Sequence, residues 1–252
     1  MNFTTAIAKE FLEQRRTRKF LIAMIVLVLF GMTSPLLAKM VPQIMTLVPG
    51  GEAYVNLIPT PTINDAVTQY VKNITQFGVL LALVFSMGAV AVEKDKGTAV
   101  MILSKPMSRG SFLLAKFTAL ALTFAIAILV AGVSCYYYTY FLFGSLDILN
   151  WIALNILVIL YILVYVALTL FFSTLTRTQF VAIGCSFGTL ILLGILSSFP
   201  GMSANLPDGL IVNASGLMMG LPITNWTSLW VSMGIILISL VGAWMIFRKQ
   251  EL

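Results

Sequence analysis

The sequence predicts an all-α membrane protein with six transmembrane helices, because of its composition and the lengths of its apolar runs. Of the 252 residues, 60% are hydrophobic and 10% are charged, and the mean hydropathy is +1.00. A water-soluble core of this size could not bury so much apolar surface. Six runs are each long enough to cross about 30 Å of hydrocarbon at about 1.5 Å per helical residue. The predicted spans are residues 20–38, 74–92, 112–133, 149–172, 180–199 and 228–247.

Residues 1–19 predict a helix that lies flat at the membrane surface before the first span. An apolar face recurs every four residues, formed by Phe3, Ile7, Phe11 and Leu12. The basic stretch is long and no small-x-small cleavage site follows the apolar run, so an uncleaved anchor is expected rather than a signal peptide. Two roles remain open for this helix, anchoring to lipid and clasping a partner subunit.

Each of the six spans reads as an ordinary membrane helix. None carries a Lys, Arg or Asp near its middle, where each such residue would cost roughly 2.5 to 3.5 kcal/mol. Between the first two spans, Pro42 and the prolines after it are expected to interrupt any long helix, and residues 62–72 to form a short helix that leads into the second span. Residues 200–227 mix turn residues with apolar ones and are expected to dip into the bilayer edge. Neither stretch is large enough for a soluble domain, so residues 1–252 form a single transmembrane domain.

The distribution of basic residues predicts the orientation in the cell membrane. Of the fifteen Lys and Arg residues, only Lys39 and Lys72 fall on one side of the predicted spans. The other thirteen are Lys9, Arg15, Arg16, Arg18, Lys19, Lys94, Lys96, Lys105, Arg109, Lys116, Arg177, Arg248 and Lys249. Since basic residues near helix ends are retained in the cytoplasm, both termini are expected to be cytoplasmic. This asymmetry and contact with anionic membrane lipid explain the net charge of +6, and nucleic acid is not expected as a partner.

Residues that carry catalytic chemistry are scarce. The chain has no histidine, and Cys135 and Cys185 lack metal-like spacing, so neither a metal nor a cofactor site is expected. Asp65, Asp147 and Asp208 are all predicted in outer loops, which leaves no carboxylate within the membrane for a proton relay. No Gly-x-x-x-x-Gly-Lys-Ser/Thr phosphate loop occurs, so the chain cannot hydrolyse ATP by that chemistry. We therefore expect no enzyme activity of its own.

The polar insert at residues 93–111, between the second and third spans, is the most informative segment. Thr98 can cap a short helix that Pro106 would stop. The helix would present an apolar ridge of residues 100–103 within a rim of charged residues, as a helix-in-groove contact requires. The rim consists of Glu93, Asp95, Lys96, Lys105 and Arg109. The alternative is a simple turn whose charges face water and whose apolar side chains rest on lipid headgroups.

The insert resembles the cytoplasmic coupling loop of ABC-2 type ABC transporter permeases. The matching pattern is Glu93, Gly97 and Thr98, then Leu103-Ser104-Lys105-Pro106 and Ser108-Arg109, before Phe112 and Lys116. The layout of an interfacial helix, six spans and this loop is also similar, in a type V exporter-like arrangement. The resemblance implies that the loop docks into a separate ATP-binding subunit, which holds ATP and Mg. It makes Glu93, Gly97 and Thr98 signature positions and implies contact or shaping roles for Met101, Leu103, Lys105, Pro106 and Arg109.

The same resemblance implies an ATP-driven permease, of which export is the commoner direction. It implies two copies of the chain, most simply a homodimer, with two ATP-binding subunits. A pathway along spans two and five would be lined by Phe77, Phe85, Phe187 and Thr189, and an apolar lining fits lipid-like or amphipathic cargo. A membrane scaffold or signal-transmitting subunit that uses the same ATPase contact without transport is the alternative function. A membrane enzyme would need an acid and base pair near the interface, and the sequence shows none.

Overall fold

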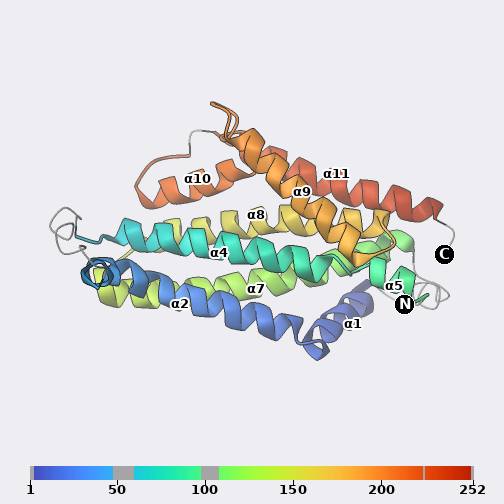
Figure 1. Cartoon of the computed structure of the whole chain (residues 1–252), viewed down its shortest axis with the longest axis horizontal. Helices are drawn as coiled ribbons and strands as arrows, with labels where there is room; N and C mark the ends of the chain where they lie inside the picture. Colours follow the sequence, from blue (N-terminus) through green and yellow to red (C-terminus); the bar gives the residue numbers. More distant parts are fainter. Residues whose placement is uncertain (1–2, 48–59, 98–107, 224, 251–252) are drawn as a thin grey trace.

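The computed structural model describes residues 3–47, 60–97, 108–223 and 225–250, and in these residues every regular element is a helix (Figure 1). In chain order the helices are α1 (Phe3–Arg16), α2 (Lys19–Thr46), α4 (Ile63–Ser86), α5 (Ala91–Asp95), α7 (Arg109–Phe143), α8 (Ile148–Leu175), α9 (Gln179–Ser197), α10 (Asp208–Met218) and α11 (Thr227–Lys249). Six segments are long and apolar enough to cross a membrane: α2, α4 continued by α5, α7, α8, α9 and α11. The predicted all-α, six-span fold class is confirmed.

Two predicted interruptions between the first two spans are absent. The helix α2 runs through Pro35 and Pro42 to Thr46, so the expectation that Pro42 ends the helix is wrong. The fixed φ of proline fits a helix, and α2 tolerates the lost backbone hydrogen bond and the crowding of the ring against the carbonyl four residues earlier. Residues 62–72 do not form a separate helix either. They begin α4, where Thr62 caps the helix and its N–H donates to the Asp65 carboxylate at 2.7 Å.

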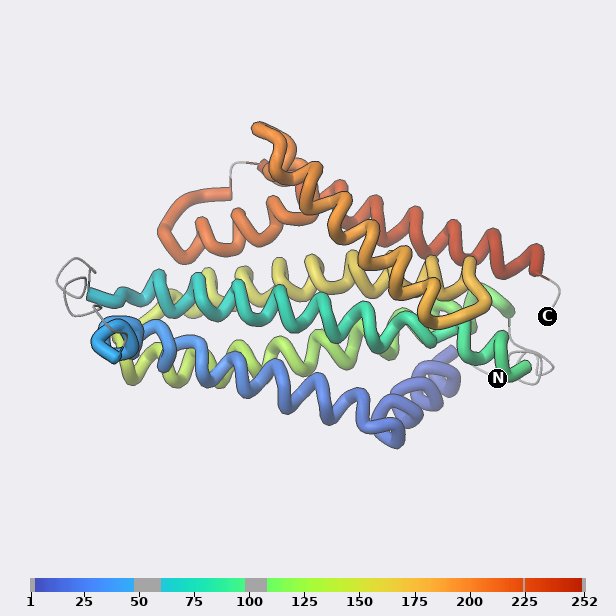
Figure 2. The backbone as a smooth tube through the Cα atoms, in the orientation of Figure 1, coloured from blue at the N-terminus to red at the C-terminus, as the bar shows by residue number. Residues whose placement is uncertain are grey.

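The helices α2, α4, α7 and α8 form the central bundle, and α9 and α11 lie along one side of it against α8 (Figure 2). Fully buried side chains such as Leu27, Ile74, Phe124 and Ile162 fill the space between the four central helices. In the most apolar stretch of α8, 56% of the residues are buried. The corresponding share is only 11% in α9 and 17% in α11. The two outer helices therefore keep most of their apolar surface available to lipid or to a partner in the membrane.

Close backbone contact holds α2 against α7. A Cβ built at Gly31 would lie 2.5 Å from the backbone oxygen of Ala131, so only glycine fits there. A buried polar chain connects α4, α8 and α7 nearby. The Tyr70 hydroxyl donates to Asn155 Oδ1 at 2.6 Å, and the Trp151 indole donates to the Gly132 carbonyl at 3.2 Å. Small residues and side-chain hydrogen bonds of this kind replace the hydrophobic driving force that membrane helices lack.

Both ends of the chain lie at the same end of the bundle, at the right of Figure 1, together with α1 and α5. We call this the terminal end. The start of α4 and the connection between α7 and α8 lie at the opposite end, where the Lys39 ammonium donates to the Leu142 carbonyl at 3.1 Å. The turn between α4 and α5 and the beginning of α7 thus belong to the same end as the two termini.

The prediction that Asp208 stands in an outer loop is wrong. Asp208 is the first residue of α10, and its carboxylate accepts a hydrogen bond of 3.1 Å from Tyr161, which lies at the middle of α8. The chain turns back after α9 and packs α10 along α8, with Leu210 and Ala214 fully buried in the main core. A carboxylate is therefore placed against the middle of a spanning helix.

Candidate functional site

The candidate site begins at a break in the second span, between α4 and α5. The helix α4 ends at Ser86 and α5 starts at Ala91. The backbone N–H groups of Val90 and Ala91 both donate to the hydroxyl oxygen of Ser173 on α8, each at 3.0 Å. On the other side of the break, the Lys19 ammonium donates to the Phe85 carbonyl at 3.1 Å. Side chains from α2 and α8 thus satisfy the backbone groups that the break exposes.

Ser173→Ala is expected to destabilise this break. The hydroxyl of Ser173 is fully buried and is the acceptor for two buried N–H groups, so its removal leaves both without a partner. A loss of about 2 kcal/mol in the free energy of unfolding is expected. The control is Ser186→Ala, because the buried Ser186 hydroxyl donates only to Ala182 of its own helix. Thermal unfolding of the purified protein in detergent measures both, and equal losses would contradict the account.

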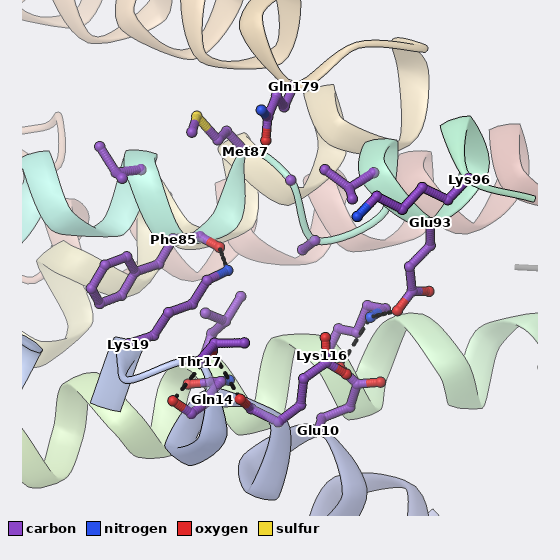
Figure 3. A pocket seen from close by; sticks show the side chains of 16 residues that line it. Glu10, Gln14, Thr17, Lys19, Phe85, Met87, Glu93, Lys96, Lys116 and Gln179 are labelled. Carbon is purple, nitrogen blue, oxygen red and sulfur yellow. Dashed lines mark hydrogen bonds and ion pairs between the residues drawn. The ribbon is translucent and has the colours of Figure 1, made fainter. Parts of the chain in front are cut away.

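A buried cluster of three charges lies next to the break (Figure 3). The Lys116 ammonium, on the first turns of α7, lies 2.7 Å from Glu93 Oε1 of α5 and 3.0 Å from Glu10 Oε2 of α1. Lys116 is only 4% exposed and Glu10 only 8%. We call these three residues the charge triad. Because each buried charge needs a partner, the triad ties α1, α5 and α7 together at one point.

The face of α1 that contacts the bundle carries two polar residues and one alanine. Ala6, Glu10 and Gln14 are buried against α7, and the Thr123 hydroxyl donates to Gln14 Oε1 at 2.6 Å. Phe3 and Leu12, which were predicted to belong to the membrane-facing stripe, are 43% and 53% exposed. The sequence left two roles open for α1. The structure adds a third, which is docking against α7 of the same chain.

The Glu10 carboxyl has a shifted pKa. Burial acts to raise the pKa of Glu10, but the positive charges of Lys116 and Lys9 outweigh it and hold the pKa below its usual range. Glu10 therefore stays ionised at neutral pH and remains attracted to Lys116. Glu10, Glu13 and Glu93 bring carboxylate oxygens within 4.8 Å of one another, a spacing that could suit a metal ion. The Lys116 ammonium already supplies the positive charge there.

The beginning of α7 is fixed to the end of α11. The Arg109 guanidinium donates to the backbone carbonyls of Phe247, Arg248 and Gln250 at 2.6, 3.1 and 2.9 Å. A cation at the carbonyl end of a helix also interacts favourably with the helix dipole. The rings of Phe112 and Phe247 stack beside this contact, with centroids 5.6 Å apart. On the α5 side, the Lys94 ammonium donates to the Thr174 carbonyl at the end of α8, at 2.6 Å.

A cavity of about 440 Å³ adjoins the triad, between α1, the end of α4 and α7. Figure 3 shows Lys19, Lys116 and Gln14, from three different helices, among the side chains that line it. Its lining combines charged and apolar side chains, so the triad lies beside open space rather than within solid packing. Space of this kind would allow α1 and α5 to shift relative to α7.

The predicted coupling residues divide into two groups. Thr98, Met101, Leu103, Lys105 and Pro106 lie outside the described residues. Glu93 faces inward to Lys116, and Arg109 binds α11, so these two predicted rim residues contact their own chain. Gly97 follows the end of α5 and has a φ of +66°, a left-handed conformation that favours glycine.

Only two of the four residues predicted to line the pathway are brought together. Phe77 and Phe187 line the same cavity, on α4 and α9. Phe85 is buried near the terminal end, where its ring lies 6.0 Å from that of Phe124 and 6.0 Å from the Lys19 ammonium. The Thr189 hydroxyl donates to the Cys185 carbonyl of its own helix.

Sequence reasoning did not assign Glu10, Lys116 or Ser173 to the site. Lys116 carried the available signal, because it is a charged residue inside a predicted apolar span. Such a residue is costly in a membrane unless a partner is present, so its position called for an acidic residue on a neighbouring helix. Ser173 carried no signal, since serine is common in membrane helices.

The amino-acid sequence is similar to those of known membrane proteins. A protein of Bacillus subtilis (strain 168) described as uncharacterized transmembrane protein YxlG is 24% identical over 252 residues, covering 97% of this chain and 96% of the relative. The family described as ABC-2 family transporter protein matches residues 4–207. Membrane proteins of this family are permease subunits of ABC transporters. With six membrane-spanning helices and a family match over most of its length, the chain belongs to the ABC-2 transporter family.

Proposed function

We propose that this protein is the permease subunit of an ATP-driven exporter, and that its terminal end faces the cytoplasm and docks a separate ATP-binding subunit. The chain would form a homodimer that binds two copies of that subunit, which hydrolyse ATP with Mg. The observation that supports this best is that the described residues on both sides of residues 98–107 are held by contacts within the bundle. There are two such fixed points, α5 through Glu93 and the beginning of α7 through Arg109.

The first fixed point would carry a movement of the docked segment into three helices. Glu93 is bound to Lys116 of α7, which in turn is bound to Glu10 of α1. A shift of α5 would therefore move α1 and α7 together through these ion pairs. The break after Ser86 separates α5 from α4 and would let α5 tilt while Ser173 continues to bind its backbone.

The second fixed point would carry the movement to the last span. Arg109 binds three carbonyls at the end of α11, so α7 and α11 are expected to move as a unit at this end. The largely exposed outer helices α9 and α11 are then free to change their contacts with a second copy of the chain. Alternating contacts of this kind would open and close a pathway along the two-fold axis.

Leu103→Ala tests the docking. The ridge at residues 100–103 is proposed to fill a groove of the ATP-binding subunit, so truncating Leu103 should weaken the complex by about tenfold. The control is Leu47→Ala, since Leu47 is 83% exposed at the opposite end. Each variant would be co-expressed with candidate ATP-binding subunits and purified in mild detergent, and the mass of the native complex would be determined.

Recovery of a complex of two permease and two ATP-binding chains, weakened only by Leu103→Ala, is the expected result. Equal complex yields for both variants would place the docking contact elsewhere. The same complexes in liposomes separate transport from signalling. ATP turnover that is stimulated by amphipathic cargo and accompanied by flux supports an exporter, and turnover without flux for any cargo would favour the scaffold function.

A further inference from the structure

A second cavity, of about 520 Å³, lies away from the charge triad, between α4, α8, α9 and the start of α10. One part of its wall is apolar and includes Phe77, Leu80 and Leu83 of α4 and Phe187 and Leu190 of α9. Its volume is in the range of sites that hold drug-sized molecules. The wall on α9 also includes Gly194, which is exposed and where an added Cβ would meet nothing within 4 Å.

The other part of the wall is polar and carries the carboxylate of Asp208. The Tyr161 hydroxyl donates to Asp208 Oδ1 at 3.1 Å, and the hydroxyls of Tyr161 and Tyr165 lie 3.4 Å apart. An ionised carboxylate can accept about four hydrogen bonds, so this group retains capacity for a ligand. The Tyr161 and Tyr165 rings also line the cavity and lie edge to face, with centroids 5.2 Å apart, and an aromatic ring attracts a cation to its face.

The position of Asp208 makes its charge significant. It lies against the middle of a spanning helix, where a charged side chain is costly without a partner of opposite charge. The lining also includes a basic residue, Lys72, which is exposed and lies on α4 three turns before Leu83 on the same face of the helix. Among the described residues, Asp208 forms no ion pair with Lys72 or with another basic side chain, so the protein does not neutralise its carboxylate.

We propose that this cavity binds an amphipathic cation, with its charged group against Asp208 and its apolar body between α4 and α9. This inference rests on the proposed function, because it assigns the cargo class of the exporter. An anion of the same shape would be repelled by Asp208. A neutral molecule would leave the carboxylate without a counter-charge in apolar surroundings.

Two ions of nearly equal shape and opposite charge test the proposal. Tetraphenylphosphonium is a lipophilic cation, and tetraphenylborate is its anionic counterpart. Equilibrium dialysis against the purified protein in detergent would measure the affinity of each, with empty micelles as the background for partitioning. Saturable binding of one phosphonium per chain, at least about tenfold tighter than borate, is expected.

Asp208→Asn should lower phosphonium affinity by about tenfold and leave borate affinity unchanged or higher. Asparagine can still accept the Tyr161 hydrogen bond, so this variant should fold. Phe187→Ala, which truncates a side chain that is 51% exposed, should weaken binding of phosphonium without affecting folding. Asp147→Asn is the control, because Asp147 caps the start of α8 and lies outside this cavity. It should bind phosphonium as the wild type does.

Equal affinities for the two ions, or wild-type phosphonium binding by a folded Asp208→Asn variant, would overturn the proposal. Binding is measured on this chain alone, without an ATP-binding subunit. A failure here therefore leaves the docking of that subunit intact, and a failure of docking leaves the measured cation site intact. The two proposals can thus be rejected separately.

Discussion

Lys116→Met is expected to lower the free energy of unfolding by about 3 to 5 kcal/mol. The substitution keeps the length of the side chain but leaves the carboxylates of Glu10 and Glu93 facing each other without the ammonium between them. Repulsion between the two carboxylates and loss of the ion pairs that join α1, α5 and α7 should follow. The loss should be smaller at acidic pH, because protonation of a carboxylate removes the repulsion.

Thermal unfolding in detergent, followed across pH 4 to 8, measures this effect, and Lys9→Met provides the control. Lys9 is bound to Glu10 and Glu13, but its side chain is 40% exposed, so its removal should cost at most about 1 kcal/mol. Changing Glu10 and Glu93 to Gln in the Lys116→Met background should restore much of the stability. Equal stability of Lys116→Met and Lys9→Met, or no recovery in the triple variant, would show that the three charges of the triad do not stabilise one another.

Gly31→Ala is expected to destabilise the bundle, although the same change in a free helix position would stabilise it. Alanine is favoured over glycine by about 1 kcal/mol in a helix. At position 31 the added Cβ would lie 2.5 Å from the Ala131 backbone oxygen, and α2 and α7 would have to separate to admit it. Forced separation of two closely packed helices should cost about 1 to 3 kcal/mol.

Gly234→Ala in α11 is the matched control, because a Cβ at Gly234 meets nothing within 4 Å. Gly31→Ala should therefore lower the unfolding temperature, and Gly234→Ala should leave it unchanged or raise it. If both substitutions raised it, the close approach of α2 and α7 would be wrong.

The spans could be predicted from the sequence because apolar length and composition decide membrane insertion locally. The ends of the helices were harder to predict from the sequence. Pro42 was expected to end the first span, yet a proline inside a helix loses one hydrogen bond and the rest of α2 continues to Thr46. Tertiary context decides whether that local loss is tolerated, and the pattern of a single segment does not contain it.

The charge triad and the Asp208 contact could not be predicted for a different reason. Each joins residues far apart in the chain, Glu10 with Lys116 and Tyr161 with Asp208. The amphipathic pattern of α1 identified its apolar stripe, but the partner Lys116 selects the polar face for contact with α7. Periodicity shows which residues share a face, and only the packing shows which face is buried.

The most direct test of the account is photo-crosslinking from the docking segment. A photoreactive benzoyl-phenylalanine would replace Met101, and in a matched control Met45, which is exposed near the end of α2. Membranes that contain the permease and its ATP-binding subunit would be irradiated and the products separated by mass. Crosslinks to the ATP-binding subunit from position 101 and none from position 45 are predicted. Crosslinks from position 101 only to lipid or to the permease itself, in a complex that co-purifies intact, would contradict the account.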